Sequence, residues 1–329
     1  MRTIKGEFDR RDGMNRRQFL ESALAVGPAA RLRGQRAASF EWGGPVLDVH
    51  LHLRSTMDGN FEHIQGSGVT KAVLLTNVNA EDHSKEVVAA YPDRFVRFAS
   101  IDVTQPDVVV RLRDAIRDGA IGLGEIKSQV EAAGPEMRRL YALAAELDVP
   151  ITIHFQEVNQ PASPGTYNRG FKKFDAMLKA FPNTKFIGHA DAFWANVSAD
   201  YADDSAYPTG RIKPGGVTDR FLSDYANLYA DMSANSCNNF LTRDPEFAAG
   251  FLVRHQNKLM FGCDCSCLDG HGTAAPRQGG PGAQAAAGPQ PRLAGKCIAR
   301  ATLTALKRLA RPEVFRKITW ENGNRLLKL

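Results

Sequence analysis

Residues 44–53 read GPVLDVHLHL, a run of branched apolar side chains that ends in two histidines spaced two apart. An apolar run of this kind, bounded by glycine and proline, is typical of a strand that is buried on both faces. Side chains alternate along a strand with a period of two, so His50 and His52 are expected on the same side. The stretch therefore predicts a buried parallel strand with a pair of imidazoles at its carboxyl end.

Seven further apolar runs follow the first. Helix-like segments separate them, among them residues 107–118, 135–147, 171–181 and 245–255. Eight strands alternating with helices over residues 44–329 predict a single-domain (β/α)8 TIM barrel, whose usual length is ~250 residues. An open doubly wound sheet is the alternative, but no G-x-G-x-x-G turn follows the first run. The other runs are TKAVLLTNV (70–78), RFVRFASIDV (94–103), AIGLGEIK (120–127), VPITIHFQ (149–156), TKFIGHAD (184–191), NLYADMSA (227–234) and KLMFGCDCS (258–266).

Two insertions follow predicted strand ends, where barrel active sites are built. Residues 192–216 follow the sixth run and are a candidate substrate lid. Residues 270–295 follow the eighth run and consist mostly of Gly, Ala, Pro and Gln, which predicts a flexible loop. The aromatic side chains expected to line the substrate pocket are Phe155, Phe193, Trp194 and Tyr207.

The positive charge of the chain is concentrated at its N-terminus. Residues 1–36 hold nine basic and four acidic residues, so they carry +5 of the formal net charge of +6. A nucleic-acid-binding protein would need a basic stripe on the folded body, so nucleic acid is disfavoured as a partner. The chain also has no run of 18 or more apolar residues, so no membrane-spanning helix is expected.

Residues 14–30, MNRRQFLESALAVGPAA, resemble a twin-arginine export signal, with Arg16 and Arg17 before a weakly apolar stretch. We therefore expect residues 1–40 to be a leader that engages the twin-arginine machinery, and the barrel to be periplasmic or otherwise exported. A disordered basic tail on a cytoplasmic protein is the alternative. The five cysteines do not settle the compartment, because neither their number nor their spacing suggests a disulfide framework or a zinc site made of four cysteines.

Ionisable side chains recur at the ends of the predicted strands. His50 and His52 end the first run, His154 the fifth, His189 the sixth and Asp264 the eighth. Any one of them could be a hydrogen-bonded core residue, but five that converge on the mouth of one barrel predict a divalent metal site. Imidazole and carboxylate ligands suit zinc, with manganese or iron as alternatives.

The chain resembles the amidohydrolase superfamily, and within it the amidohydrolase-2 branch of metal-dependent TIM-barrel hydrolases and decarboxylases. The resemblance rests on DVHLHL, YPDRFVRFASIDV, VPITIHF, FPNTKFIGHAD, MFGCDCS and ITWENGNRLLKL, and runs from about residue 44 to the C-terminus. It implies His50, His52, His154 and Asp264 as metal ligands. It also implies that His189 binds a second metal or acts in catalysis.

The fourth run, GLGEIK, leaves the number of metal ions open. Relatives with two ions bridge them with a fourth-strand Glu or carboxylated Lys, and Glu125 and Lys127 share one face here. Glu125 needs no modification to bind a metal, so it is favoured over Lys127; a Glu–Lys ion pair is the structural alternative. Asp48 shares its face with His50 and is a candidate partner of the metal ligands.

Other candidates are weaker. Asp269 and His271 follow Asp264 closely and could reach the substrate, but a loop turn is the favoured explanation. The cysteines of CDCSC fall opposite Asp264 if the strand continues, so they are expected to face the surrounding helices. The remaining histidines lie in helix-like segments and are expected at the surface; they are His63, His83 and His255.

The sequence thus favours a metal-dependent hydrolase of a small ester, lactone or amide. One or two metal ions would activate a water, Asp264 would act as general base, and His189 would polarise the substrate carbonyl or help to hold a second ion. The first alternative is a decarboxylase of an aromatic or unsaturated acid with a one-metal site. The second is an exported binding barrel without catalysis.

Overall fold

The computed structural model describes residues 40–160, 163–273, 293 and 295–329, and one compact unit, Phe40–Leu329, holds every element described below. The predicted leader lies outside the described residues except for Phe40, as does most of the predicted flexible loop at 270–295. No helix in the described part of the chain combines the length and apolar character needed to cross a membrane.

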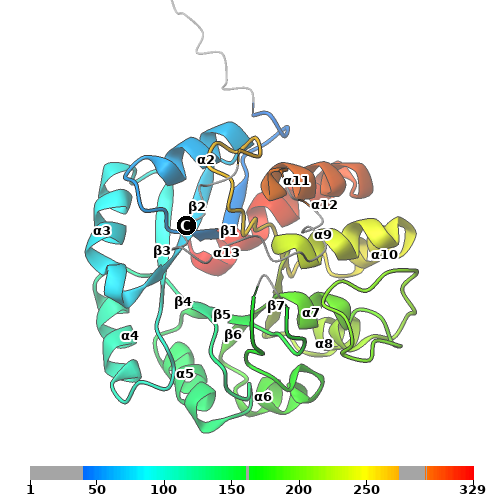
Figure 1. Ribbon diagram of the computed structural model, residues 1–329, viewed down its shortest axis with the longest axis horizontal. Coiled ribbons are helices and arrows are strands. Elements are labelled where there is room, and N and C mark those ends of the chain that lie inside the picture. The colour runs from blue at the N-terminus through cyan, green and yellow to red at the C-terminus, as the bar shows by residue number, and fades with distance from the viewer. Residues whose placement is uncertain (1–39, 161–162, 274–292, 294) are drawn as a thin grey trace, which may run out of the picture. The chain divides into compact units, whose positions relative to one another are not determined.

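Eight parallel strands form the sheet, in the order in which they occur along the chain, and helices surround it (Figure 1). Each of the eight apolar runs contains one strand, which confirms the predicted TIM barrel. The strands are β1 (Leu47–His52), β2 (Lys71–Asn77), β3 (Phe95–Ser100), β4 (Leu123–Ile126), β5 (Pro150–His154), β6 (Lys185–His189), β7 (Leu228–Asp231) and β8 (Leu259–Met260).

The eighth strand is much shorter than its run predicts, because regular pairing with β7 ends at Met260. The chain beyond it nevertheless closes the barrel against β1. The backbone N–H of Val49 donates to the carbonyl of Phe261 at 2.9 Å, and that of Asp264 donates to the carbonyl of His50 at 2.8 Å. The segment after β8 is therefore fixed beside the histidine pair without being a regular strand.

Helices cover the outside of the sheet, and all four predicted helical segments are present. The α-helices are α2 (Gly59–Ser67), α3 (Glu81–Ala90), α4 (Val108–Arg117), α5 (Pro135–Glu146), α6 (Asp175–Ala180), α7 (Asp191–Ala195), α8 (Val217–Asp224), α9 (Ala234–Arg243), α10 (Pro245–Arg254), α11 (Ile298–Leu309), α12 (Pro312–Arg316) and α13 (Asn322–Leu327). The structure also has two 3-10 helices, η1 (Val78–Ala80) and η2 (Phe171–Lys173), and a π-helix, η3 (Lys317–Glu321), among the described residues.

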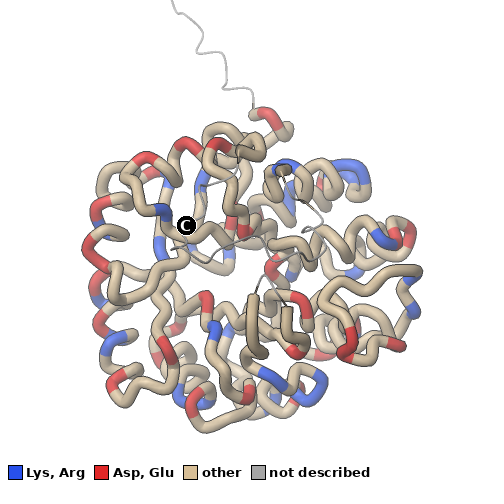
Figure 2. Tube along the Cα trace, viewed as in Figure 1, with Lys and Arg blue, Asp and Glu red and all other residues tan. Residues whose placement is uncertain are grey.

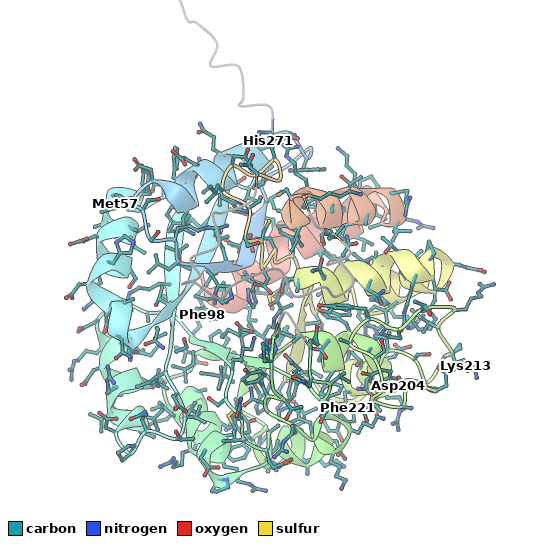
Figure 3. The ribbon with its side chains drawn as sticks, viewed as in Figure 1. Met57, Phe98, Asp204, Lys213, Phe221 and His271 are labelled. Atoms are coloured by element: carbon teal, nitrogen blue, oxygen red, sulfur yellow. The ribbon has the colours of Figure 1, made fainter. Side chains whose placement is uncertain are left out.

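A separate apolar cluster fills the inside of the barrel. Phe98, labelled in Figure 3, and Val73 belong to it, and Leu326 and Leu327 of α13 pack against Leu47 and other members near the strand starts. The C-terminal helix therefore covers the end of the barrel opposite the strand ends that carry the histidines. One end of the barrel is therefore packed with apolar side chains, and the other end carries the candidate functional residues.

Charged residues of both signs alternate along the helical ring in Figure 2. This agrees with the near-neutral charge expected for the chain beyond its first 36 residues. In that view, the described part of the barrel shows no face on which charges of one sign predominate.

Candidate metal centre

His50 is buried at the end of β1 with both ring nitrogens directed at carboxylates. Its Nδ1 lies 2.5 Å from Oδ2 of Asp231, at the end of β7. A carboxylate accepts hydrogen bonds, so Nδ1 carries the proton and Nε2 keeps its lone pair. Nε2 lies 3.8 Å from Oε2 of Glu125 and 3.9 Å from Oδ1 of Asp264, and has no hydrogen-bond partner among the described residues.

His52 lies nearer the barrel mouth, with half of its side chain exposed. Its Nε2 is 3.3 Å from both Oε2 of Glu125 and Oδ1 of Asp264. Partial burial lowers the pKa of His52, but the two carboxylates outweigh this and raise it to about 10. The two histidines of the H-x-H pair therefore present their Nε2 atoms to the same pair of carboxylates, as expected.

Glu125 of β4 stands between two groups of histidines. Its Oε2 faces His50 and His52, whereas its Oε1 lies 3.4 Å from Nε2 of His189 and contacts Nδ1 of His154. Burial raises the pKa of the Glu125 carboxyl, but the surrounding imidazoles hold it well below its ordinary value. One ionised carboxylate is thus shared by side chains from three other strands.

Gln156 orients His154. Nε2 of His154 lies 2.9 Å from the amide oxygen of Gln156. The orientation of that amide is defined, because its nitrogen donates to three carbonyls, those of Val158, Ser163 and Gly165. Nε2 of His154 must therefore be the donor to Gln156. Nδ1 shares a proton with the Glu125 carboxylate and is the nitrogen that a cation would bind in place of that proton.

His189 of β6 is oriented from its other side by Ser233 and Asp231. Its Nδ1 lies 2.9 Å from Oγ of Ser233 and 3.2 Å from Oδ2 of Asp231. Its Nε2 is buried and unpartnered within the described residues. Burial lowers the pKa of His189, but Asp231 and Glu125 raise it to about 10.

Asp231 was not among the predicted site residues, yet it contacts Nδ1 of both His50 and His189. Burial raises its pKa, but the two imidazoles hold it well below the ordinary value, so it stays ionised. The sequence carries a signal for it, since Asp231 lies within the seventh run just as Asp264 lies within the eighth. The absence of a side chain at Gly262 makes room for it, because a Cβ there would lie 2.3 Å from Oδ1 of Asp231.

Asp264 borders the mouth, where about a third of its side chain is exposed. It adopts a φ of 47°, a left-handed conformation that aspartate and asparagine tolerate better than most residues. This turn places Oδ1 beside Nε2 of His52. Burial raises the Asp264 pKa, but His52 and His50 hold it below its ordinary value.

These residues fit a divalent metal. Ligand atoms of His50, His52 and Glu125 lie within 4.8 Å of one another, and so do those of Glu125, His154 and His189. Two buried Nε2 atoms lack partners among the described residues, and two imidazoles take up protons that a cation would replace. The nitrogen and oxygen donor set suits zinc, manganese or iron. All six predicted site residues are therefore brought together at one end of the barrel.

Lys127 and Asp48 serve other contacts. Nζ of Lys127 donates to Oγ of Ser163 at 2.8 Å and lies 4.9 Å from the centre of the Tyr167 ring, so it lines the pocket and forms no ion pair with Glu125 among the described contacts. Oδ1 of Asp48 accepts the backbone N–H groups of His50 and Cys263 at 2.9 and 3.0 Å. β1 is irregular between Asp48 and Leu51, so Asp48 supports the backbone and Asp231 contacts the His50 ring instead.

Two histidines that were expected at the surface are buried. His63 packs under the chain that follows β8, where its Nδ1 lies 3.0 Å from the carbonyl of Cys267. His255 packs against Phe251 and lies 2.6 Å from Oδ1 of Asp219. The prediction was wrong because both helices face inward at these positions. His83 is partly exposed, as its side chain accessibility of 31% shows.

The Asp269 carboxylate forms a turn. Its Oδ1 accepts hydrogen bonds from the backbone N–H groups of His271, Gly272 and Thr273, and its Oδ2 accepts one from the hydroxyl of Thr273. Figure 3 places His271 at the upper edge of the molecule, away from the centre of the barrel. The loop-turn interpretation therefore accounts for this pair, and neither side chain joins the centre.

A pocket of about 190 Å³ opens beside the centre. Tyr207 of the 192–216 insertion lines it, together with Lys127, Asp191, Ser236 and Asp264. The other three aromatic residues predicted for the pocket wall are packed in the core instead: Phe155, Phe193 and Trp194. Nε1 of Trp194 donates to the carbonyl of Asp231 at 3.0 Å, so this residue supports the centre from behind.

Comparison with known proteins gives one family match. A family model described as amidohydrolase (Amidohydro_2) matches residues 54–329, which includes every strand after β1. No curated protein matches the sequence. The match begins two residues after His52, so the H-x-H pair lies just outside it.

Solved structures share the fold at low sequence identity. A probable 2-pyrone-4,6-dicarboxylic acid hydrolase from Acinetobacter baumannii, with citric acid bound, is 13% identical with a TM-score of 0.53, over 87% of this chain and 100% of that one. The 5-carboxyvanillate decarboxylase from Novosphingobium aromaticivorans, complexed with manganese and 4-hydroxy-3-methoxy-5-nitrobenzoic acid, is 14% identical with a TM-score of 0.53, over 88% and 97%. Dihydroorotase from Campylobacter jejuni is 16% identical with a TM-score of 0.51, over 86% and 83%. These likenesses show the barrel fold alone.

Proposed function

Because this chain belongs to the amidohydrolase family, as the match over residues 54–329 shows, we propose that it is a metal-dependent hydrolase of a small ester, lactone or amide. The family match confirms the resemblance drawn from the sequence. Membership alone does not select the reaction, since hydrolases and a decarboxylase share the fold. The choice of hydrolysis rests on the geometry of the centre.

The observation that supports hydrolysis is the position of Glu125 between two sets of histidine nitrogens. One carboxylate oxygen faces His50 and His52, and the other faces His154 and His189. A carboxylate placed in this way can bridge two ions, whereas a one-metal site has no need of a bridge. We therefore assign two metal positions, held by these five residues together with Asp264.

Bound divalent ions would lower the pKa of a water ligand from 15.7 towards about 7 and so supply a nucleophile at neutral pH. Asp264 is ionised and borders both His52 and the pocket. It is thus placed to accept the proton of the attacking water and to return it to the leaving group. Asp231, Ser233 and Gln156 keep the histidines in the tautomers that this arrangement needs.

The pocket favours a small substrate that carries a negative charge. Its volume is below the roughly 300–1,000 Å³ of pockets for drug-sized ligands. Lys127 lines it and would attract a carboxylate, while buried Oγ of Ser236 and Oδ2 of Asp191 have no hydrogen-bond partner among the described residues. We propose that polar groups of a carboxylate-bearing ester or lactone occupy these positions.

The test combines metal analysis with a matched substrate panel. Purified chain should contain two ions at the centre and should hydrolyse carboxylate-bearing lactones or esters better than their neutral methyl esters. Glu125→Gln should lose hydrolysis together with one ion. Release of carbon dioxide from aromatic acids by a protein with one ion, and no hydrolysis, would instead establish the decarboxylase. Stoichiometric metal with neither reaction would support the non-catalytic barrel.

We also propose that the twin-arginine motif directs export, which rests on the sequence of residues 14–30. Replacing Arg16 and Arg17 together by Lys should retain the protein in the cytoplasm, because the export machinery recognises the arginine pair. Fractionation of cells that express the parent and the variant measures this. An unchanged distribution would exclude the proposal.

A further inference from the structure

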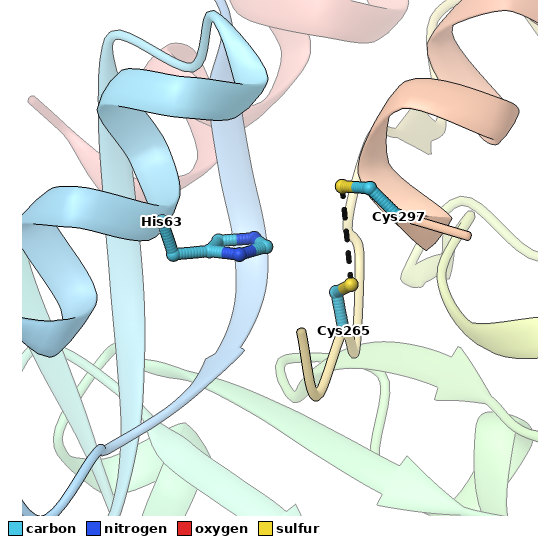
Figure 4. Close-up of side chains that lie close together, drawn as sticks. All are labelled: His63, Cys265 and Cys297. Carbon is cyan, nitrogen blue, oxygen red and sulfur yellow. Dashed lines mark hydrogen bonds between the residues drawn. The ribbon is translucent and has the colours of Figure 1, made fainter. Parts of the chain in front are cut away.

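A second cluster of metal-binding side chains lies away from the candidate metal centre. His63 comes from α2, Cys263, Cys265 and Cys267 follow β8, and Cys297 directly precedes α11. Figure 4 shows His63, Cys265 and Cys297 of this set. All five residues are buried, with relative accessibilities that do not exceed 4%. Three segments that are distant in sequence thus bring one imidazole and four thiols together.

The spacing of these atoms resembles that of a tetrahedral zinc site. Zinc–sulfur bonds of ≈ 2.3 Å and zinc–nitrogen bonds of ≈ 2.0–2.1 Å give edges of about 3.8 Å between sulfurs and about 3.6 Å between sulfur and nitrogen. Sγ of Cys265 lies 3.9 Å from that of Cys297 and 3.3 Å from that of Cys267. Nδ1 of His63 lies 3.6 Å from Sγ of Cys267. These three separations are within about half an ångström of those that one ion would impose, and ligand atoms of His63, Cys265 and Cys297 lie within 4.8 Å of one another.

The surroundings favour thiolates. The backbone N–H of Ile298, in the first turn of α11, donates to Sγ of Cys265 at 3.2 Å, and a helix N-terminus stabilises negative charge. Arg54 donates to the carbonyls of Cys265, Ser266 and Cys267. Three thiolates and one Zn²⁺ would carry a net charge of −1, which this guanidinium beside the loop offsets.

His63 is suited to be the fourth ligand. Its Nδ1 lies next to the carbonyl of Cys267, an interaction that a metal would replace. Its Nε2 lies 3.8 Å from Sγ of Cys263, which can accept the remaining ring proton and so orient the ring.

We propose that His63, Cys265, Cys267 and Cys297 bind one structural zinc ion, separate from the candidate metal centre. Four protein ligands complete a closed tetrahedral site, which leaves no position for a substrate. The spacing of the cysteines in the sequence does not suggest a zinc site, because the fold supplies two of the four ligands from α2 and the start of α11. A disulfide is the competing arrangement, but it would pair only two of the three clustered sulfurs and give His63 no role.

Cobalt substitution tests this assignment without reference to catalysis. The candidate metal centre has only nitrogen and oxygen ligands, so thiolate-to-cobalt charge-transfer absorption in the near ultraviolet reports the cysteine cluster alone. Full-length protein produced in cobalt-supplemented medium should show this absorption. Cys297→Ser should abolish it and reduce the metal content by one ion per chain. Cys237→Ala, which changes a buried cysteine outside the cluster, should retain it, and so should His50→Ala.

The parent protein provides a second measurement in case Cys297→Ser does not fold. The cluster thiols should resist a thiol reagent until zinc is removed with a chelator, and should then react. Cobalt-loaded parent protein without charge-transfer absorption would overturn the proposal. So would a disulfide between any two cluster cysteines, detected by mass spectrometry of alkylated, non-reduced protein. Neither result depends on whether the chain hydrolyses any substrate.

Discussion

Asp231→Asn tests how the candidate metal centre is oriented. Asp231 accepts from Nδ1 of His50 at 2.5 Å and lies 3.2 Å from Nδ1 of His189. Asparagine keeps the shape of the side chain but removes the negative charge, and its amide can present a donor where the rings need an acceptor. His50 would then favour the tautomer with a proton on Nε2, the nitrogen that faces the metal position.

The size of the effect follows from the contacts. His189 keeps a partner at Nδ1, because Oγ of Ser233 lies 2.9 Å away. The loss therefore falls mainly on one charge-assisted hydrogen bond, that of His50, which is worth about 1.5–3 kcal/mol. At about 1.4 kcal/mol per factor of ten, metal affinity should fall roughly 10–150-fold. This range agrees with the roughly 10–100-fold cost of removing partners of metal-binding histidines.

Manganese is the appropriate probe, since thiolates bind it poorly and the cysteine cluster will not compete. Free Mn²⁺ measured by electron paramagnetic resonance gives the dissociation constants of the parent and the variant. Asp224→Asn, an exposed carboxylate near β7, is the matched control and should bind as the parent does. If Asp231→Asn keeps a native circular dichroism spectrum and binds within about threefold of the parent, the orienting role is refuted.

Three further changes test the surrounding argument. In Asp264→Asn, asparagine tolerates the same left-handed backbone but cannot accept a proton, so turnover should fall about 10²–10⁴-fold. Manganese binding should weaken less than in His50→Ala. Activity within about threefold of the parent would remove the general-base role. Lys127→Met should raise KM for carboxylate-bearing substrates roughly tenfold or more, because a charged contact worth about 1.5–3 kcal/mol is lost. KM for the neutral methyl esters of these substrates should not change. Equal effects on both kinds of substrate would exclude charge recognition. Asp219 accepts from Arg254 and His255, which hold its pKa below 3.8 although burial raises it; its stabilisation is therefore complete at neutral pH and lost as the pH falls below that value. Asp219→Asn should cost about 1 kcal/mol in urea unfolding at pH 7 and less at pH 3, and an equal cost at both pH values would contradict this.

The barrel could be predicted because each strand carries its own signal. Buried parallel strands are continuous apolar runs, and eight of them recur between amphipathic helices, so the fold follows without knowledge of any contact. The position of the centre follows from the same rule, since His50, His154, His189 and Asp264 each lie at or near a strand end. Glu125 was chosen over Lys127 on chemical grounds, and the structure places its carboxylate among the histidines.

Other features depend on contacts that no local pattern records. The irregularity of β1 between Asp48 and Leu51 turns Asp48 towards the backbone of Cys263, and a period-two argument assumes a regular strand. The burial of His63 depends on the chain that crosses α2 more than 200 residues later. Trp194 was expected in the pocket because it follows a strand end, but α7 turns it inward to the carbonyl of Asp231. Each error arises where a tertiary contact overrides a local rule.

The segment after β8 connects the two clusters. Asp264 points to the candidate metal centre, whereas Cys263 and Cys265 on either side of it point to α2 and α11. The backbone of Asp264 is held at a φ of 47° by its hydrogen bond to His50 on one side and by the thiol contacts of its neighbours on the other. An ion bound by the cysteines would limit the same backbone torsions that place Oδ1 of Asp264 beside His52. Occupancy of the cysteine cluster should therefore tighten metal binding at the centre. Because coupling between two sites is reciprocal, occupancy of the centre should tighten metal binding at the cluster by the same factor. Manganese affinities of the parent and of Cys297→Ser would measure that factor, and equal affinities would show that the two clusters are independent although they share one short segment.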